Sequence, residues 1–360
     1  MTNTLNINHL PTNTWNWLKI NSTKIEWATN NVQSADFTFS GLASGIVHKE
    51  NASSESDSYY NTETSCGNDV RDFLLANHIK PNLLTIQKNA KLENPLVINF
   101  SLLNNANVAN SFIIKAEENS SATVIMIYES EESSNGNQVI RTICHAEKNA
   151  SLHFVRVQLL GNHFSQIDDV GTLCNDEGSV ELTHIILGGA KTYTGAVSTL
   201  SSYKGSFISN TAYYCKNTQE LDLNYIVRCI AKKVFCNMVV KGTLQDKAKK
   251  TYRGSIDFKS GCKGADGEET EDVLVLSKDA VNKSVPLILC NEEDIAGEHA
   301  STIGKLGDGI LFYMQSRGLS KENAEKIMAQ AKIRSVASRI EDENINEKIN
   351  AFMEKVFQND

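Results

Sequence analysis

Ser151-Leu-His-Phe-Val-Arg-Val-Gln-Leu159 and Val180-Glu-Leu-Thr-His-Ile-Ile-Leu187 are the two stretches that decide the fold class. Each has the length of a β-strand, is rich in β-branched and aromatic residues, and is set off by small polar residues. Runs of the same kind follow one another through the middle of the chain, at 96–102, 111–115, 122–128, 139–144, 220–227, 235–240, 251–258 and 273–277. Almost no helical pattern separates these runs, so the sequence predicts a core made of many consecutive strands.

The turns ahead of the strands recur at a loose interval. Small-residue phrases begin at Lys148, Asn175, Tyr203 and Asp246. The first two intervals suit one coil of a repeating structure, and the third leaves room for a coil that the pattern misses. A β-sandwich also has short strands, but a run of this length would need two sandwiches and a linker, and no linker is visible. We therefore predict a mainly β fold with a right-handed parallel β-helix, or solenoid, over residues 94–302.

Both flanks of the predicted solenoid look different from it. Residues 1–93 are mixed, with a helix expected over Val70–Ile79 and a loop over Asn51–Asn68. Residues 303–360 are predicted to form three helices, over 308–317, 321–333 and 344–357. The last helix carries an apolar stripe from Ile345 to Val356, which can pack on the chain's own body or on a partner. The chain is thus expected to have helical segments at both ends of a β core.

Composition excludes several classes of protein. The 360 residues include 35 Lys and Arg against 43 Asp and Glu, a net charge of −8, and 41% are hydrophobic. These values fit a soluble globular protein, and they argue against collagen-like or disordered chains and against a protein that coats nucleic acid. No export signal and no apolar run of spanning length is visible, so we expect a cytoplasmic protein with no membrane partner.

The sequence offers little support for an enzyme. It contains no G-x-x-x-x-G-K-[ST], no G-x-S-x-G and no H-E-x-x-H. None of its eight cysteines forms a C-x-x-C, and most are expected to be buried core thiols, including Cys290, although Cys290 can also be a soft metal ligand. Cys229 and Cys236 can meet across neighbouring strands, but the default expectation is a hairpin that carries two core thiols.

Two phrases near the C-terminus resemble a known family. Glu298-His-Ala-Ser-Thr-Ile-Gly-Lys-Leu306 is followed by Leu311-Phe-Tyr-Met-Gln-Ser-Arg-Gly-Leu319, and together they resemble the SufB/SufD family of iron–sulfur cluster assembly proteins. The matching residues are His299, Gly304, Leu311, Phe312, Tyr313, Ser316, Arg317 and Gly318. Weaker similarity extends to 251–255, to 289–297 and to the region around Trp15 and Trp17.

This resemblance implies a non-catalytic scaffold subunit of a SUF-type complex. It implies that Phe312, Tyr313, Arg317 and Gly318 help to dock a SufC-like ABC ATPase, and that a SufB/SufD-type paralogue or a second copy associates edge to edge. It further implies that Glu298 and His299 are ligands for iron or an iron–sulfur cluster, bound transiently. Family members of the SufB type carry a Cys on an earlier strand, where this chain has Glu271 or Asp272, so the resemblance favours a SufD-like member.

Each of these assignments has an alternative. His299 can be a solvated histidine bonded to the backbone, and adjacent residues such as Glu298 and His299 face opposite sides of a strand unless it bulges. Arg317 can simply complement the dipole at a helix C-terminus. At the level of the whole chain, the alternatives are a carbohydrate-active β-helix enzyme and a purely structural solenoid that binds partners.

Overall fold

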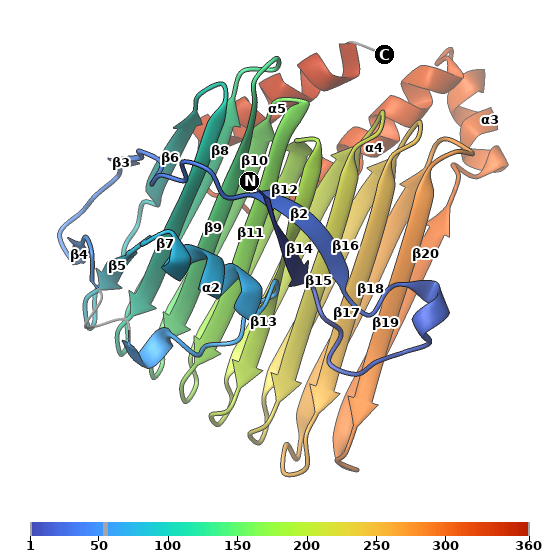
Figure 1. The fold of residues 1–360 in the computed structure, drawn as a ribbon. Coiled ribbons are helices and arrows are strands. Elements are labelled where there is room, and N and C mark those ends of the chain that lie inside the picture. The colour runs from blue at the N-terminus through green and yellow to red at the C-terminus, as the bar shows by residue number, and fades with distance from the viewer. Residues whose placement is uncertain (1, 53–56, 359–360) are drawn as a thin grey trace.

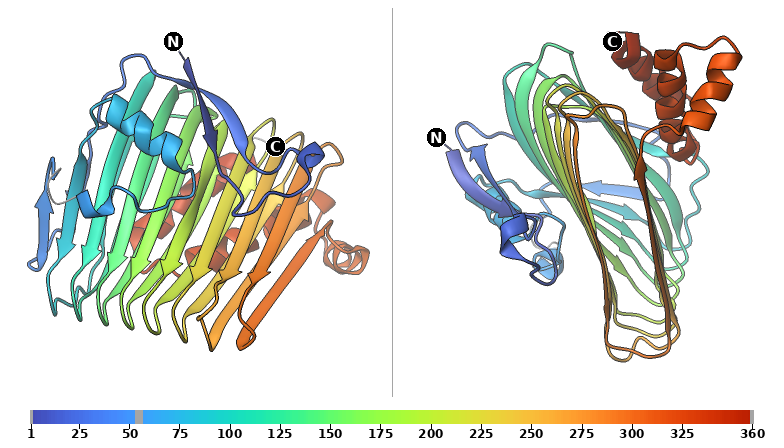
Figure 2. Two further views of the ribbon diagram at one scale, coloured as in Figure 1. Left: turned by 60° about the horizontal axis from the view of Figure 1, so that its bottom comes forward. Right: turned by 90° about the vertical axis from the view of Figure 1, so that its right-hand side faces the viewer.

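The computed structural model describes residues 2–52 and 57–358 of the chain. Within these residues the strands form a parallel solenoid of two facing nine-stranded sheets, and successive strands from β5 onward alternate between the two sheets (Figure 1). One sheet has the order β20-β18-β16-β14-β12-β10-β8-β6-β3, and the other has the order β19-β17-β15-β13-β11-β9-β7-β5-β4. Helices cover the first of these sheets and N-terminal segments cover the second (Figure 2, right). We call them the helix-covered sheet and the strap-covered sheet.

The strands of the two sheets have the following bounds. The helix-covered sheet contains β3 (Thr38–Ser40), β6 (Leu96–Leu102), β8 (Ser121–Ser130), β10 (Ser151–Leu160), β12 (Ser179–Gly188), β14 (Ser206–Cys215), β16 (Phe235–Leu244), β18 (Ala265–Val275) and β20 (Ile295–Gly304). The strap-covered sheet contains β4 (Ile46–Lys49), β5 (Pro81–Ile86), β7 (Ala106–Ala116), β9 (Asn135–Ala146), β11 (His163–Cys174), β13 (Lys191–Leu200), β15 (Glu220–Cys229), β17 (Lys249–Phe258) and β19 (Val281–Cys290).

The solenoid prediction is confirmed, and so is every strand expected from the sequence. The strands β11, β13, β14, β19 and β20 of the core were not expected, and neither were β1 (Thr2–Ile7), β2 (Thr23–Ala28) and β3 to β5 in the N-terminal region. The hairpin expected around Cys229 and Cys236 is not formed, because β15 and β16 lie in different sheets. The inward-facing positions of the unexpected core strands still stack in register on apolar neighbours, as Leu200 does on Cys229. Position within the stack, rather than the local apolar pattern, makes these segments strands.

Residues with a left-handed backbone conformation mark one corner of each coil. Their positions explain the uneven spacing of the turn phrases in the sequence. Asn119, Asn149, Glu177, Lys204 and Lys233 all have φ between 53° and 59° and occupy successive coils. The backbone N–H of each of these residues donates to a carbonyl oxygen of the next coil, as Lys204 N does to Lys232 O at 3.1 Å. The phrase at Asp246 belongs to the opposite corner, where Asn217 is its predecessor, so the long interval compared two different corners.

The solenoid interior is apolar with a polar centre. Side chains such as Phe154, Leu182 and Phe207 fill it and are essentially inaccessible. Arg156 lies among them, paired with Asp168 at 3.1 Å and donating to Thr194 Oγ1 at 3.0 Å. Buried charges of this kind persist only when they are paired. The coils are therefore held by stacked apolar side chains and by a small buried ion pair.

The N-terminal region is less helical than the sequence suggested. Its strands β1 (Thr2–Ile7) and β2 (Thr23–Ala28) form an antiparallel pair, joined by a loop that contains the 3-10 turn η1 (Asn16–Leu18). Residues 2–28 form what we call the strap. A second 3-10 turn, η2 (Asp57–Tyr59), precedes the helix α2 (Asn68–Ala76), which confirms the helix expected near Val70. Part of the loop expected over Asn51–Asn68, residues 53–56, lies outside the described residues.

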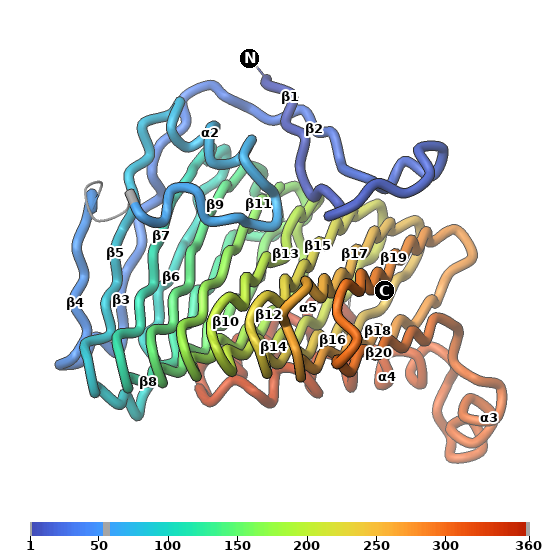
Figure 3. The backbone as a smooth tube through the Cα atoms, turned by 90° about the horizontal axis from the view of Figure 1, so that it is seen from below, coloured from blue at the N-terminus to red at the C-terminus, as the bar shows by residue number. Residues whose placement is uncertain are grey.

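The three C-terminal helices agree with the sequence analysis. They are α3 (Asp308–Ser316), α4 (Lys321–Ala337) and α5 (Glu343–Gln358). Ile345, Ile349 and Met353 of α5 are buried against outward-facing residues of the helix-covered sheet, such as Val157 of β10. The apolar stripe of the last helix therefore packs on the chain's own body. Burial of this stripe fixes α4 and α5 along the sheet and leaves α3 at the end of the solenoid (Figure 3).

Candidate functional site at the open end of the solenoid

The last coil exposes two strand edges. Among the described residues, β19 pairs only with β17 and β20 pairs only with β18, so each is the terminal strand of its sheet. Nine of the ten residues of β20 are exposed and the remaining one is half-buried. An uncovered edge carries unpaired N–H and C=O groups that can pair with another chain. The end of the solenoid at β19 and β20, which we call the open end, is therefore the place to look for an interface.

The backbone bonding pattern shows which residues of β20 face the free edge. In parallel sheets, alternate residues bond to alternate neighbours. Asp266 N donates to Val234 O at 3.0 Å, so the even-numbered residues of β18 bond to β16 and the odd-numbered ones bond to β20. With the register Gly267↔Gly297, the even-numbered residues of β20 bond back to β18. The N–H and C=O groups of His299, Ser301 and Ile303 consequently point to the free edge.

The structure does not bring Glu298 and His299 onto one face. Both are exposed on β20, and the strand keeps an unbroken register with β18 from Ile295 to Gly304. Glu298 is opposite Glu268, and His299 is opposite the buried Glu269. Because neighbouring residues of a strand face opposite sides, the His299 imidazole shares the inner face with Glu269, while Glu298 faces outward. The pair cannot hold one ion together in this conformation.

Beneath His299 the inner face of the open end is acidic and polar. Burial raises the pKa of Glu269 to about 7. Glu271, one step along the same face, is ion-paired with Lys250 and accepts from Ser284 at 3.0 Å and from Ser301 at 3.1 Å. Burial lowers the pKa of Lys250, although Glu271 opposes that shift. Sequence reasoning missed this group because its members come from four strands, and only the register places them together.

The cysteines that the structure describes near the open end are not placed to hold a metal ion. Seven of the eight cysteines are buried, and burial raises the pKa of thiols such as Cys66 and Cys144. Cys290 is exposed, so the expectation of a buried core thiol was wrong at this position; it faces inward on the last coil, where no further coil covers it. Its Sγ donates to Glu292 O at 3.1 Å. Among the described residues, no three His, Cys, Asp or Glu side chains are placed to hold a metal ion.

The predicted partner-binding residues lie on α3 and at its C-terminal end, and α3 projects beside the open end (Figure 3). Phe312 and Tyr313 are 74% and 59% exposed, and Ile310 adjoins them as a third exposed apolar residue that the sequence analysis did not single out. The Arg317 guanidinium lies 5.4 Å from the centre of the Tyr313 ring. Gly318 follows the helix and has a φ of 89°, which is a left-handed conformation. Glycine adopts this conformation readily and commonly ends a helix in this way. An exposed apolar surface of this kind on a short helix is typical of a docking element.

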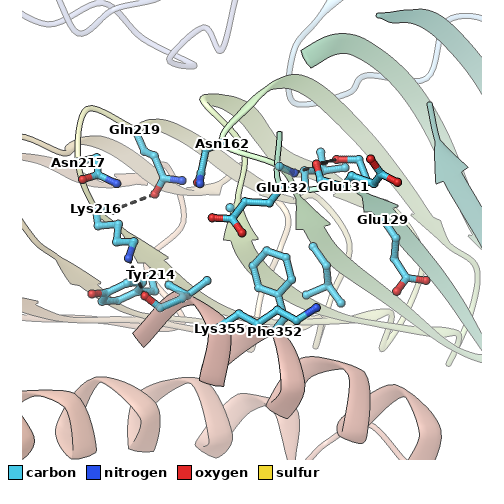
Figure 4. A pocket seen from close by; sticks show the side chains of 16 residues that line it. Glu129, Glu131, Glu132, Asn162, Tyr214, Lys216, Asn217, Gln219, Phe352 and Lys355 are labelled. Atoms are coloured by element: carbon cyan, nitrogen blue, oxygen red, sulfur yellow. Dashed lines mark hydrogen bonds between the residues drawn. The ribbon is translucent and has the colours of Figure 1, made fainter. Parts of the chain in front are cut away.

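A separate pocket of about 340 Å³ lies between α5 and the turns of the solenoid (Figure 4). Glu131 and Glu132 line one side of it, and Phe352 and Lys355 line the other. Lys216 Nζ donates to Val356 O at 2.6 Å and ties α5 to the solenoid at this place. None of the predicted metal ligands and none of the predicted ATPase-docking residues lines this pocket, although Phe352 and Val356 of the predicted apolar stripe do. The predicted metal ligands Glu298 and His299 lie at the open end and not at the pocket.

The two-sheet parallel solenoid with one open end and a helical C-terminus defines the class of the protein as a mainly β solenoid. The family model "SUF system FeS cluster assembly, SufBD core domain" matches residues 100–332. The chain belongs to this SufBD family. This membership supports a role in iron–sulfur cluster assembly and not carbohydrate cleavage.

Curated proteins that are similar in sequence to this chain point to the same family. An iron-sulfur cluster assembly SufBD family protein of Staphylococcus saprophyticus is 26% identical over 256 residues, which cover 69% of this chain and 54% of the relative. A protein of the same description from Staphylococcus aureus is also 26% identical over 256 residues, with the same coverage. The iron-sulfur cluster assembly protein SufD of Bacillus subtilis is 27% identical over 114 residues, which cover 32% of this chain and 26% of the relative. The chain spans about half the length of the curated relatives it matches most extensively. The helices that the structure describes include none with the length and apolar character needed to span a membrane.

Proposed function

We propose that the chain is a non-catalytic, SufD-like scaffold subunit of a cytoplasmic SUF-type complex. Its family membership supports a role in cluster assembly, and the observation that carries the scaffold role is the open end. The strand of SufB-type members that bears a Cys corresponds here to the region of Glu271 and Asp272, which supports the SufD-like assignment. In this role the chain binds partners and presents groups to iron, and it does not turn over a substrate.

The open end pairs with another solenoid. Its partner is a SufB/SufD-type paralogue or a second copy of the chain, whose own open end offers the same unpaired groups. Pairing would satisfy the free N–H and C=O groups of β20 and bury the apolar side chains that the last coil leaves accessible, such as Ile303. The same event would place the inner face of the open end, with His299 and Glu269, at the centre of the interface.

Iron or an iron–sulfur cluster is the cargo held at this interface. Imidazole is a suitable ligand for iron, and His299 is exposed on the inner face, where a partner can add further ligands. Because Glu298 faces the opposite side, it would reach the same ion only if pairing bends β20.

A SufC-like ABC ATPase docks on α3. The exposed Ile310, Phe312 and Tyr313 supply an apolar surface beside the open end, so ATPase movements there could act on the interface. Deleting everything after Gly318 would also remove α4 and α5, which cover the helix-covered sheet. Paired substitutions are therefore the cleaner test: F312S/Y313S should abolish co-purification of the ATPase with the full chain, while Tyr203→Ser, at a distant turn, should not. Equal recovery with both variants would refute this docking site.

The experiment for the proposed function is anaerobic reconstitution of the assembled complex with iron and sulfide, followed by absorption spectroscopy. His299→Ala should keep the fold and ATPase binding but reduce the cluster absorption at least about tenfold, since the loss of one ligand contact typically costs that much or more. His153→Ala, which changes a histidine on an outer face far from the open end, is the matched control. Normal reconstitution of the His299→Ala complex would refute the assignment.

A further inference from the structure

The strap presents two tryptophans that the fold of this chain does not use. Trp15 directly precedes η1 and Trp17 lies within it, and the two residues are 70% and 73% exposed. Their rings stack on each other with centres 6.4 Å apart and planes inclined by 18°. Tryptophan is the residue most enriched at the energetic centres of protein interfaces. A stacked and exposed pair of tryptophans is therefore a candidate contact surface for another protein chain.

Hydrogen bonds within the loop that carries the tryptophans hold its conformation. Asn21 braces it from within, since its Oδ1 accepts from Thr14 N at 2.8 Å and its Nδ2 donates to Asn16 Oδ1 at 2.9 Å. The loop ends are closed by Leu10 N donating to Asn21 O at 2.9 Å. A braced loop loses little conformational freedom on binding, which favours its use as a contact surface.

The strap is also anchored close to the open end. Arg253 of β17 donates from Nε to Ile20 O at 2.6 Å, and the same guanidinium pairs with Asp222 and reaches Thr23 Oγ1 at 3.0 Å. β17 is the last strand but one of the strap-covered sheet. η1 lies on the outer side of this sheet at the level of the last coils (Figures 1 and 3). A chain stacked on the open end would thus meet the tryptophans.

The complementary surface is present on the same chain. Val285, Leu287 and Leu289 of β19 are opposite Arg253, Ser255 and Asp257 in the register, so they face outward on the strap-covered sheet. They are half-buried, although an outward face of an edge strand is usually polar. An interface between two identical copies uses one patch on both, so that a feature of each chain meets its complement on the other. The tryptophans and the β19 stripe form such a pair.

We propose that Trp15 and Trp17 cover the outward apolar stripe of β19, formed by Val285, Leu287 and Leu289, in a second copy of the chain stacked on the open end. This inference rests on the edge pairing of the proposed function and extends it, because it makes the N-terminal strap a clamp across the junction. Two clamps act per dimer, one from each copy. The strap thereby gains a role beyond covering its own sheet.

The test is sedimentation equilibrium of the full chain over a concentration series. W15S/W17S should raise the dimer dissociation constant at least about tenfold, which is the scale of a lost interface hot spot. The control L103S/Y203S removes two exposed side chains from turns away from the open end and should leave the constant unchanged. Circular dichroism and thermal unfolding of each variant verify that the fold is retained.

Three outcomes would overturn the inference. If wild type and W15S/W17S dimerise equally, the strap is not a clamp, while edge pairing itself stands. If L103S/Y203S weakens the dimer as much, the effect is not specific to the strap. If the wild type stays monomeric throughout, a second copy is not the occupant, and the reconstitution assay still tests the proposed function independently.

A cross-linking experiment locates the contact. In the Cys290→Ser background, one tagged copy carries Trp17→Cys and a differently tagged copy carries Leu287→Cys. A short bismaleimide should join the two tags, and moving the second cysteine to Leu103 should abolish the product. A product equally abundant with both acceptor positions would contradict the proposed contact.

Discussion

The two ends of the solenoid are finished in opposite ways. At the first end, β3 and β4 pair antiparallel with β6 and β5, and Phe37 closes the interior, with its ring centre 5.6 Å from that of Phe100 and 5.2 Å from that of Phe112. At the other end, no comparable plug covers β19 and β20 among the residues that the structure describes. Stacked repeats need caps to protect their terminal faces. This contrast between the ends supports our proposal that the open end receives a partner, and each prediction below compares the open end with the closed parts of the molecule.

The largest expected effect compares two isoleucines one coil apart. Ile256 and Ile288 occupy the same inward position on β17 and β19, but Ile256 is fully buried and Ile288 is only half-buried. Ile256→Ala should lower the free energy of unfolding by about 2–5 kcal/mol, the usual range for a buried isoleucine. Ile288→Ala should cost less than half as much in the isolated chain. Chemical denaturation measures both, and equal losses would mean that the open end is already packed like the interior.

The next effect concerns the free edge of β20 and uses two neighbouring prolines. Ile303→Pro removes an N–H that points to the free edge, whereas Thr302→Pro removes one that bonds to β18. Ile303→Pro should therefore weaken association by about 3 kcal/mol, roughly a hundredfold, with little change in stability. Thr302→Pro should mainly destabilise the isolated chain. Sedimentation and thermal unfolding separate the two effects, and the reverse assignment would show that the edge faces the other way.

A smaller effect is a pH dependence that arises from Glu269. Burial raises the pKa of this carboxyl from its ordinary value of 4.5 to about 7, so the folded state holds a proton that the unfolded state releases between these values. The resulting stabilisation is complete below about pH 4.5 and is lost as the pH rises through 7. Since one pKa unit corresponds to about 1.36 kcal/mol, the stabilisation amounts to about 3 kcal/mol.

Glu269→Gln tests this dependence. The variant should be more stable than the wild type above pH 7 and should lose the slope of stability between pH 4.5 and 7 that the carboxyl contributes. Glu268→Gln, on the outer face of the same strand, provides the control and should keep the slope. Denaturation curves at several pH values give the result, and an unchanged slope in Glu269→Gln would contradict the assignment.

The sequence predicts much of the solenoid and less of the site. Strands such as β10 and β12 are evident because their inward residues are apolar, and the helices α4 and α5 are evident from their caps and periodicity. β19 and β20 were missed because several of their inward positions carry polar residues, which give no apolar pattern. These residues are Ser284 on β19, and His299 and Ser301 on β20, where Ser301 donates to Glu271. These residues form strands because they pair in register with the strands of the preceding coil.

The family motif identified His299 from the sequence, but not its surroundings. Which side of β20 it faces depends on the register with β18, and the register also separates it from Glu298. The exposure of Cys290 likewise follows from its place on the last coil and not from its apolar neighbours in the sequence. Local patterns therefore predicted elements, whereas contacts between coils decided the site.

Amide hydrogen exchange along β20 tests most directly the claim that the open end is the functional interface. In the dilute chain, the amides of His299, Ser301 and Ile303 should exchange quickly, and those of Ala300 and Thr302, which bond to β18, should exchange more slowly. Once the chain is associated with its solenoid partner, the odd-numbered amides should become protected as well. Fast exchange at these three positions in the assembled complex would contradict the account.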